Sequence, residues 1–228
     1  MSISKTIHDL ITKKSFLTGK QVAFKANDNI SEFMRVGYQD LLVDEVAEKM
    51  QEVLKALVID VENDHNTQET ARRVAKMFVL ELFKGRYEKP PRVTSFPNVT
   101  SYDQLYVTGP ITVRSTCAHH FQNIRGKCYI GVYPGKKVIG LSKFNRIVDW
   151  IASRPQIQEE MTMQIANEIK AVTEAEGIAV LMRAEHACCT HRGVKEHESD
   201  MTTSVMLGMF REQFSLKQEF LSIVGTMK

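Results

Sequence analysis

Residues 127–141, KCYIGVYPGKKVIGL, lie where the chain changes from helical to extended patterns. Residues 127–133 are rich in β-branched and aromatic side chains, and the PGK that follows supplies a turn. VIGL at 138–141 is a second short extended piece, and ITVRS at 111–115 has the same character upstream. These segments predict neighbouring β-strands in the middle of the chain.

Helical periodicity precedes these strands. Apolar residues recur at three- and four-residue steps from Leu41 to Leu57, which predicts one helix. A second stripe begins near Asn66, whose spacing from Glu69 fits a capping box, and Gly85 is the expected C-cap.

Helices and strands alternate in blocks after residue 141. Ser142 is the expected cap of a helix that stops before Pro155, and another helix ends near Gly177. Residues 178–189 and 201–210 are predicted strands, and a short helix closes the chain. Because no run of alternating βαβ units occurs, we expect an α+β fold, an antiparallel sheet with helices on one face, preceded by an N-terminal helical region.

The composition is that of a globular chain. The 228 residues are 43% hydrophobic, and the net charge of +3 is too small to indicate nucleic-acid binding by itself. No stretch reaches the ~18 apolar residues of a membrane span, and the N-terminus lacks the features of a signal peptide. We expect a soluble cytoplasmic protein whose four cysteines are reduced and available to a metal.

The sequence CAHHF, residues 117–121, predicts two ligands of a metal site. Cys117 and His120 have the C-x-x-H spacing with which a turn presents two ligands to one ion. Cys117 and His119 would share a face only in a straight strand. The turn therefore favours His120 as the ligand.

A third ligand is expected from residues 178–189. Taken as a strand, this segment places His186 and Cys188 on one face and Cys189 on the other, where Cys189 would be a small buried hydrophobe. Two thiolates and one imidazole suit Zn²⁺, and three protein ligands leave the fourth position of a catalytic zinc to water. The alternative is a set of buried cysteines and unrelated histidines.

Several long motifs give the chain a specific resemblance. They follow one another from about residue 41 to the C-terminus: ETARRVAKM, CAHHF, GKCYIGVYP, VIGLSKFNRIVDWIASRPQIQEEMTMQIA, EHACCTHRG and SVMLGMFRE. In these segments the chain resembles GTP cyclohydrolase I. Residues 1–40 lie outside the resemblance.

The resemblance implies a hydrolase that converts GTP and water to 7,8-dihydroneopterin triphosphate and formate, the first step of pterin and tetrahydrofolate-type biosynthesis. It also implies a tunnelling fold (T-fold) and a homodecamer with active sites at subunit interfaces, with neither nucleic acid nor membrane as a partner. We accordingly expect an N-terminal extension of uncertain order (1–40), a helical region and connector (41–100) and a T-fold catalytic domain (101–228).

The resemblance also assigns catalytic roles. Cys117, His120 and Cys188 would hold Zn²⁺. His119 would protonate N7 of the purine, and His186 would transfer protons in the later steps at the ribose. The remaining catalytic residue is Ser142, at the ribose and phosphates.

Substrate-binding residues follow from the same motifs. Lys143 and Arg146 lie one helical turn apart, and with Arg192 they would bind the triphosphate, with Arg73 as a further candidate. Glu159 would accept hydrogen bonds from the N1–H and amino group of guanine, and Gln158 beside it is expected to contact the base. Glu160 is more simply an exposed helix residue.

Two residues depart from the pattern of the family. Ala118 stands where the family commonly has a glutamate, which removes a carboxylate close to the metal, and Ala71 replaces a proline at a helix start. Neither change deletes a predicted ligand. Ligation through Cys189 is geometrically the second choice.

Two other functions share part of this pattern. One is a non-catalytic, zinc-stabilised binding or assembly module, which would predict loss of the proton-transfer or GTP-binding residues. The other is a related T-fold enzyme acting on another purine or pterin. The presence of Glu159 together with the complete set of cations favours a guanine nucleoside triphosphate.

Overall fold

The computed structural model describes residues 2–22 and 24–227, and its internal contacts divide the chain into two compact units, Met1–Lys89 and Pro90–Lys228. The three-part division expected from the sequence, with boundaries after residues 40 and 100, stays a prediction. Within the described residues, no helix combines the length and apolar character needed to cross a membrane.

The first unit is helical. Its elements are α1 (Ile3–Thr18), the 3₁₀ helix η1 (Ser31–Phe33), α2 (Tyr38–Ala56), α3 (Thr70–Lys76), the π-helix η2 (Met77–Leu82) and α4 (Lys84–Tyr87). Helix α2 confirms the helix predicted from Leu41 to Leu57. The isoleucines Ile3, Ile7 and Ile11 lie on one stripe of α1 and are buried in the core of this unit.

A carboxylate joins α1 to α2. Glu45 of α2 accepts hydrogen bonds from Ser4 N (2.9 Å) and Ser4 Oγ (2.6 Å), and these bonds lower its pKa although partial burial acts in the opposite direction. Part of the segment 1–40 is therefore a packed helix.

The predicted capping box is absent. Asn66 N and Nδ2 both donate to Asp64 Oδ1, as in a local turn, and Glu69 takes the N-cap position of α3 without a side-chain capping bond. Gly85 lies inside α4 and ends no helix. Local side-chain hydrogen bonds, which the 3.6-residue period does not reveal, decide this boundary.

The second unit holds the sheet. Its elements are β1 (Ser95–Pro97), β2 (Tyr106–Cys117), β3 (Asn123–Tyr133), β4 (Lys137–Ile139), α5 (Leu141–Ala152), β5 (Pro155–Gln156), α6 (Gln158–Thr173), β6 (Gly177–His186), α7 (Ala187–Thr190), β7 (Met201–Gly208), α8 (Met209–Glu212) and α9 (Phe214–Thr226). The main sheet has the order β5-β2-β3-β6-β7, antiparallel from β2 to β7, with β5 parallel to β2. Strands β1 and β4 form a separate pair.

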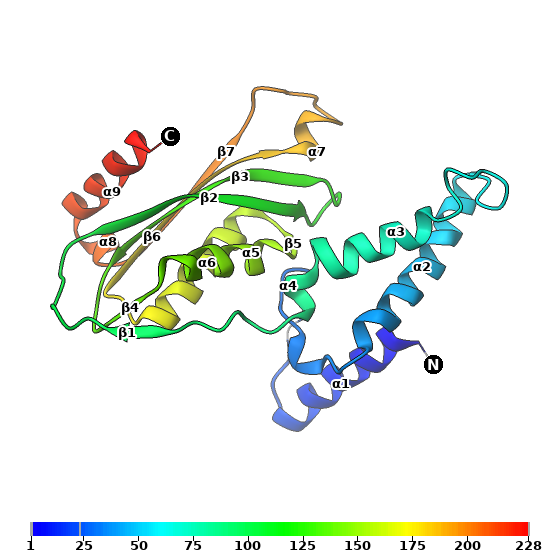
Figure 1. Cartoon of the computed structure of the whole chain (residues 1–228), viewed down its shortest axis with the longest axis horizontal. Coiled ribbons are helices and arrows are strands. Elements are labelled where there is room, and N and C mark those ends of the chain that lie inside the picture. The colour runs from blue at the N-terminus through cyan, green and yellow to red at the C-terminus, as the bar shows by residue number, and fades with distance from the viewer. Residues whose placement is uncertain (1, 23, 228) are drawn as a thin grey trace. The chain divides into compact units, whose positions relative to one another are not determined.

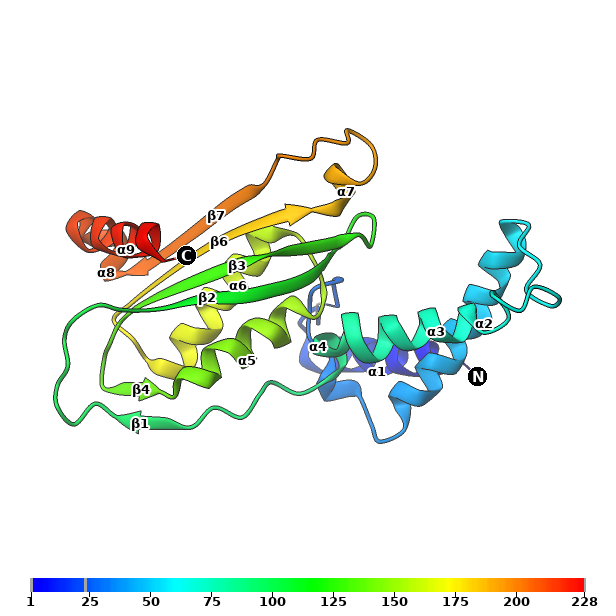
Figure 2. The same ribbon diagram turned by 45° about the horizontal axis from the view of Figure 1, so that its top comes forward.

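Helices α5 and α6 lie together on one face of the main sheet (Figure 1, Figure 2). Their apolar residues recur at helical spacing, as in Ile147 and Ile151 of α5 and Ile165 and Ile169 of α6, and all four are at most 1% exposed. They pack in one cluster with alternate residues of the strands, such as Ile130. The expected α+β fold is confirmed.

The opposite face carries a smaller cluster. Phe210 of α8 and Phe220 of α9 pack against Tyr129 and Ala179 of the sheet. The C-terminal helix therefore covers part of the second face, an addition to the expected arrangement of helices on one face.

The start of α5 differs from its prediction. Gly140, with extended backbone, takes the N-cap position, and Ser142 is the second residue of the helix. The hydroxyl of Ser142 is therefore not used as the cap.

Gly126 tests how closely β3 and β6 are paired. A Cβ atom on Gly126 would lie against Arg183 O and 2.6 Å from Ala184 Cα, so Gly126→Ala should force the two strands apart. We expect a loss of about 1–3 kcal/mol in the free energy of unfolding, measured by urea denaturation at fixed protein concentration.

Gly225 is the matched control. It lies in α9, and beyond the backbone of that helix a Cβ there would meet no heavy atom within 4 Å, so Gly225→Ala should be neutral or stabilising by up to about 1 kcal/mol. Equal stabilities for the two variants would contradict the close approach of β3 and β6.

Candidate functional site

A tight turn follows the last residue of β2. Phe121 N–H donates to Cys117 O (2.9 Å), and Phe121 itself adopts a left-handed conformation with a φ of 51°. Ala118 N–H donates to Gln156 O (2.9 Å), which ties the turn to β5. The turn brings His120 back beside Cys117, as the C-x-x-H spacing predicts.

Strand β6 ends at His186, and helix α7 begins directly after it. The prediction of a strand over residues 178–189 is therefore wrong at its end, and strand alternation does not separate Cys188 from Cys189. Consecutive helical residues point about 100° apart, since 3.6 residues make one turn. Cys188 is half-buried, whereas Cys189 is exposed, which corrects the expectation that Cys189 is a buried hydrophobe.

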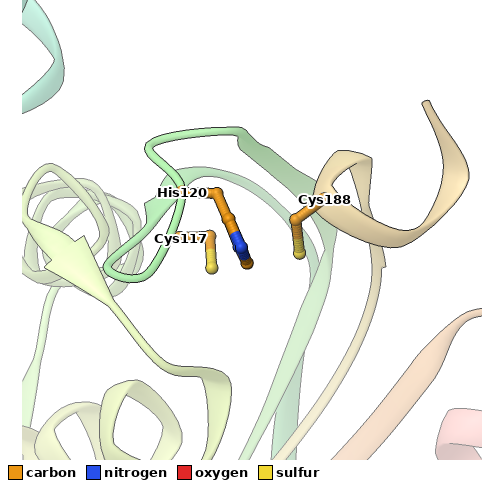
Figure 3. Close-up of side chains that lie close together, drawn as sticks. All are labelled: Cys117, His120 and Cys188. Carbon is orange, nitrogen blue, oxygen red and sulfur yellow. The ribbon is translucent and has the colours of Figure 1, made fainter. Parts of the chain in front are cut away.

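Cys117, His120 and Cys188 form one cluster of ligand atoms. The two sulfurs and an imidazole nitrogen all lie within 4.8 Å of one another. Figure 3 shows the three side chains directed into the same space, Cys117 from the end of β2, His120 from the turn after it and Cys188 from α7. This agrees with the ligand set predicted from the sequence.

The donor chemistry of the cluster suits a soft or borderline divalent cation. Burial, and after it the neighbouring Cys117, raise the pKa of the Cys188 thiol to about 11. Two thiolates this close repel each other, and a cation between them removes that penalty. The residues present therefore fit a zinc ion, with three protein ligands and one position left open.

His119 is directed differently from His120. Both side chains are exposed, and their ring centroids lie 6.4 Å apart with an angle of 80° between the ring planes. His119 is not a member of the ligand cluster. Its predicted role as a proton donor stays a prediction.

His186 lies at the junction of β6 and α7, where it contacts the first turn of α6. Its Nε2 forms a hydrogen bond with Gln158 Oε1 (2.8 Å). Partial burial lowers the pKa of His186, and the carboxylate of Glu159 opposes that shift. Gln158 is only 1% exposed, so its side chain is held inside the protein, whereas Glu159 is exposed.

The predicted phosphate-binding cations lie on exposed or half-exposed positions. Lys143 and Arg146 are on α5, Arg192 follows α7, and within the described residues none of the three forms an ion pair. Ser142 is exposed at the start of α5. Arg73 is exposed on α3 in the first unit, and its substrate contact stays a prediction.

Thr203 of β7 belongs to the surroundings of His186 but has no motif in the sequence. Its hydroxyl lies 3.1 Å from Gln158 Nε2, because the pairing of β6 with β7 brings Thr203 opposite Met182. Only the register of the strands could have identified it.

The sequence model of GTP cyclohydrolase I matches residues 45–225 of this chain. The chain belongs to the GTP cyclohydrolase I family. Its enzymes include GTP cyclohydrolase 1 of Actinobacillus pleuropneumoniae serotype 5b, which is 40% identical over 182 residues, 79% of this chain and 83% of the relative. GTP cyclohydrolase 1 of Mannheimia succiniciproducens is 39% identical over 181 residues, with the same coverage.

The antiparallel sheet with α5 and α6 on one face is the tunnelling fold of this family. A solved structure of the archaeosine synthase QueF-Like in the apo form is 14% identical and covers 53% of this chain and 97% of its own, at a TM-score of 0.37. That likeness is too slight to support any statement about the site.

Cys188 and Cys189 are a matched pair for testing the metal site. Cys188→Ala removes a member of the ligand cluster and should weaken metal binding by roughly 100-fold or more. Even mutation of a residue that only hydrogen-bonds to a metal ligand typically lowers metal affinity by about 10- to 100-fold. Cys189→Ala should keep the wild-type metal content. Elemental analysis after dialysis against a competing chelator measures both, and loss of metal from the Cys189 variant would show that the ligand set is wrong.

Proposed function

We propose that this protein is a zinc-dependent GTP cyclohydrolase that acts in the cytoplasm. It would convert GTP and water to 7,8-dihydroneopterin triphosphate and formate. The observation that carries the proposal is the convergence of Cys117, His120 and Cys188 within 4.8 Å of one another, in a chain of this family. An open fourth position distinguishes this set from a structural zinc site, which normally has four protein ligands.

Zinc would supply Lewis acidity and lower the pKa of a bound water to about 7. The chain's own residues would do the remaining work. His119, exposed beside the cluster, can hold a proton for N7 of the purine, since an imidazole exchanges protons near neutral pH. His186 is half-buried and lies two residues before the third ligand, Cys188. It would transfer protons at the ribose, and Ser142 would form hydrogen bonds with the ribose and the phosphates.

Charge and hydrogen-bonding capacity match the two ends of GTP. Lys143, Arg146 and Arg192 have no ion-pair partner in the described residues, so their charges are available to a triphosphate. The exposed carboxylate of Glu159 can accept both the N1–H and the amino group of guanine. Arg73 is a further candidate for the phosphates.

A homo-oligomer is part of the proposal. Strand β7 (eight residues) is an edge of the main sheet, bonded to β6 on one side only in the described chain. An edge of this length presents a row of backbone groups that can pair with another strand. A second copy of this chain could extend the sheet there, and the resemblance to the family implies a decamer with sites completed at subunit interfaces.

The proposal predicts formate release from GTP by the zinc-loaded protein. His119→Ala should keep its zinc, since His119 is outside the ligand cluster, and should lose roughly 10²- to 10⁴-fold in kcat. Formate is measured with a coupled dehydrogenase, and zinc by elemental analysis. Absence of formate from zinc-loaded, assembled wild type would refute the enzyme, whereas loss of zinc from the variant would refute only the role given to His119.

Glu159 and Glu160 are neighbouring exposed carboxylates and give a second matched pair. Glu159→Gln replaces a carboxylate with an amide and should lower kcat/KM for GTP by roughly 10⁴-fold, because one of the two guanine donors would face an NH₂ group and not an acceptor. Glu160→Gln should change kcat/KM by less than about threefold. A similar loss of kcat/KM in both variants would indicate a general electrostatic effect and would contradict a direct hydrogen bond between Glu159 and guanine.

A further inference from the structure

The side chain of Gln158 is enclosed at the first turn of α6. It is 1% exposed, and its Nε2 lies near three acceptors: Met201 O (2.9 Å), Thr203 Oγ1 (3.1 Å) and Met182 O (3.3 Å). Its Oε1 lies 2.8 Å from His186 Nε2. Both ends of the amide are therefore used inside the protein.

Two main-chain carbonyls fix the orientation of this amide. Met182 O and Met201 O can only accept hydrogen bonds, so the end of Gln158 that faces them must be the NH₂ group. A flipped amide would place Oε1 against two oxygens that can only accept, so both hydrogen bonds would be lost, which is costly for a buried amide. The oxygen of Gln158 therefore faces His186.

The hydroxyls of Thr162 and Thr203 agree with this direction. Thr162 Oγ1 donates to the main-chain oxygen of Gln158 (2.7 Å), so its single hydrogen is used. The 2.7 Å contact between Thr162 and Thr203 must then be donated by Thr203. Thr203 has no second hydrogen, and so it accepts from Gln158 Nε2. A closed ring of hydrogen bonds with one direction results.

We propose that Gln158 is a positioning residue that holds the His186 ring as its Nε2–H tautomer and leaves Nδ1 to face the substrate. Gln158 Oε1 can only accept, so His186 Nε2 must carry a hydrogen. Among the described residues, no hydrogen bond is formed by His186 Nδ1. The lone pair of the neutral ring is therefore at Nδ1, which is the ring nitrogen left available to the substrate.

This inference rests on the proposed function and gives Gln158 a different task from the expected contact with the base. A direct contact with guanine would require the amide to leave Met182, Met201, Thr203 and His186. A residue that acts only through His186 should affect turnover and not substrate binding. The two roles are therefore distinguishable by a comparison of kcat with KM.

The test is the tautomer of His186 in the full-length, zinc-loaded protein without GTP, with ¹⁵N in the histidine rings. Long-range ¹H–¹⁵N correlation spectra, assigned by the signal lost in His186→Asn, should show a protonated Nε2 and an unprotonated Nδ1. A protonated Nδ1 in the neutral wild-type ring overturns the proposal, whether or not the protein turns over GTP. This readout also decides the matter if a Gln158 variant does not fold.

Gln158→Met keeps the length of the side chain but has no amide. It should give a mixture of tautomers and reduce kcat for formate release by roughly 100-fold or more, as expected when a histidine loses its orienting partner. KM for GTP should stay within about twofold of wild type, since uniform binding is unaffected. A large rise in KM at unchanged kcat, or an unchanged tautomer, would overturn the positioning role.

Thr162→Val is the matched control. It removes a buried hydroxyl from the same ring of hydrogen bonds, one helical turn away, but touches neither His186 nor the side chain of Gln158. It should keep the tautomer and the kcat of wild type. If Thr162→Val reduces kcat as much as Gln158→Met, the effect is a general loosening of the region and the proposal fails.

Discussion

The antiparallel pairing of β3 with both β2 and β6 determines where the site can form. Because β3 runs opposite to both neighbours, β2 and β6 run in the same direction and end at the same edge of the sheet. Ile124 of β3 is paired with Ser115 on one side and with His186 on the other. Cys117 and Cys188 each follow this row by two residues, so the strand register brings two distant thiols to the same edge of the sheet.

The same register accounts for the surroundings of the ligand cluster. The turn after β2 adds His120 and directs His119 elsewhere, and the change from β6 to α7 turns Cys188 toward Cys117. Helix α6 packs on the sheet through fully buried residues such as Ile165, which fixes the position of its first turn. Gln158 and Glu159 in that turn are therefore held beside His186, one inside the protein and one exposed.

Much of this arrangement could be predicted from the sequence, since apolar periodicity located α2, α5 and α6, and motif spacing identified the three members of the ligand cluster. Cys188 was the predicted third ligand, but the reason was incorrect: the strand ends at His186, and helical geometry separates Cys188 from Cys189. Strand ends and helix caps depend on local hydrogen bonds that periodicity does not encode. The role of Gln158 depends on Thr203 and two main-chain carbonyls, which only the fold brings together.

Family membership and the ligand cluster support each other, because a family match alone does not place atoms and a cluster alone does not name a reaction. Ala118 and Cys189 leave the cluster intact: Ala118 is a small side chain between Cys117 and the histidines, and Cys189 adds an exposed thiol 4.0 Å from Cys188 Sγ. That thiol is a group that could compete for the fourth position of a bound metal.

X-ray absorption at the zinc edge of the loaded wild-type protein tests the ligand set most directly. Binding by Cys117, His120 and Cys188 predicts two sulfur neighbours at about 2.3 Å and two nitrogen or oxygen neighbours at about 2.0–2.1 Å, one of them exchangeable. Three sulfur neighbours would mean that Cys189 closes the site, and a shell of oxygen and nitrogen alone would mean that the metal binds elsewhere. Either result would contradict a zinc site with one position open to the reaction.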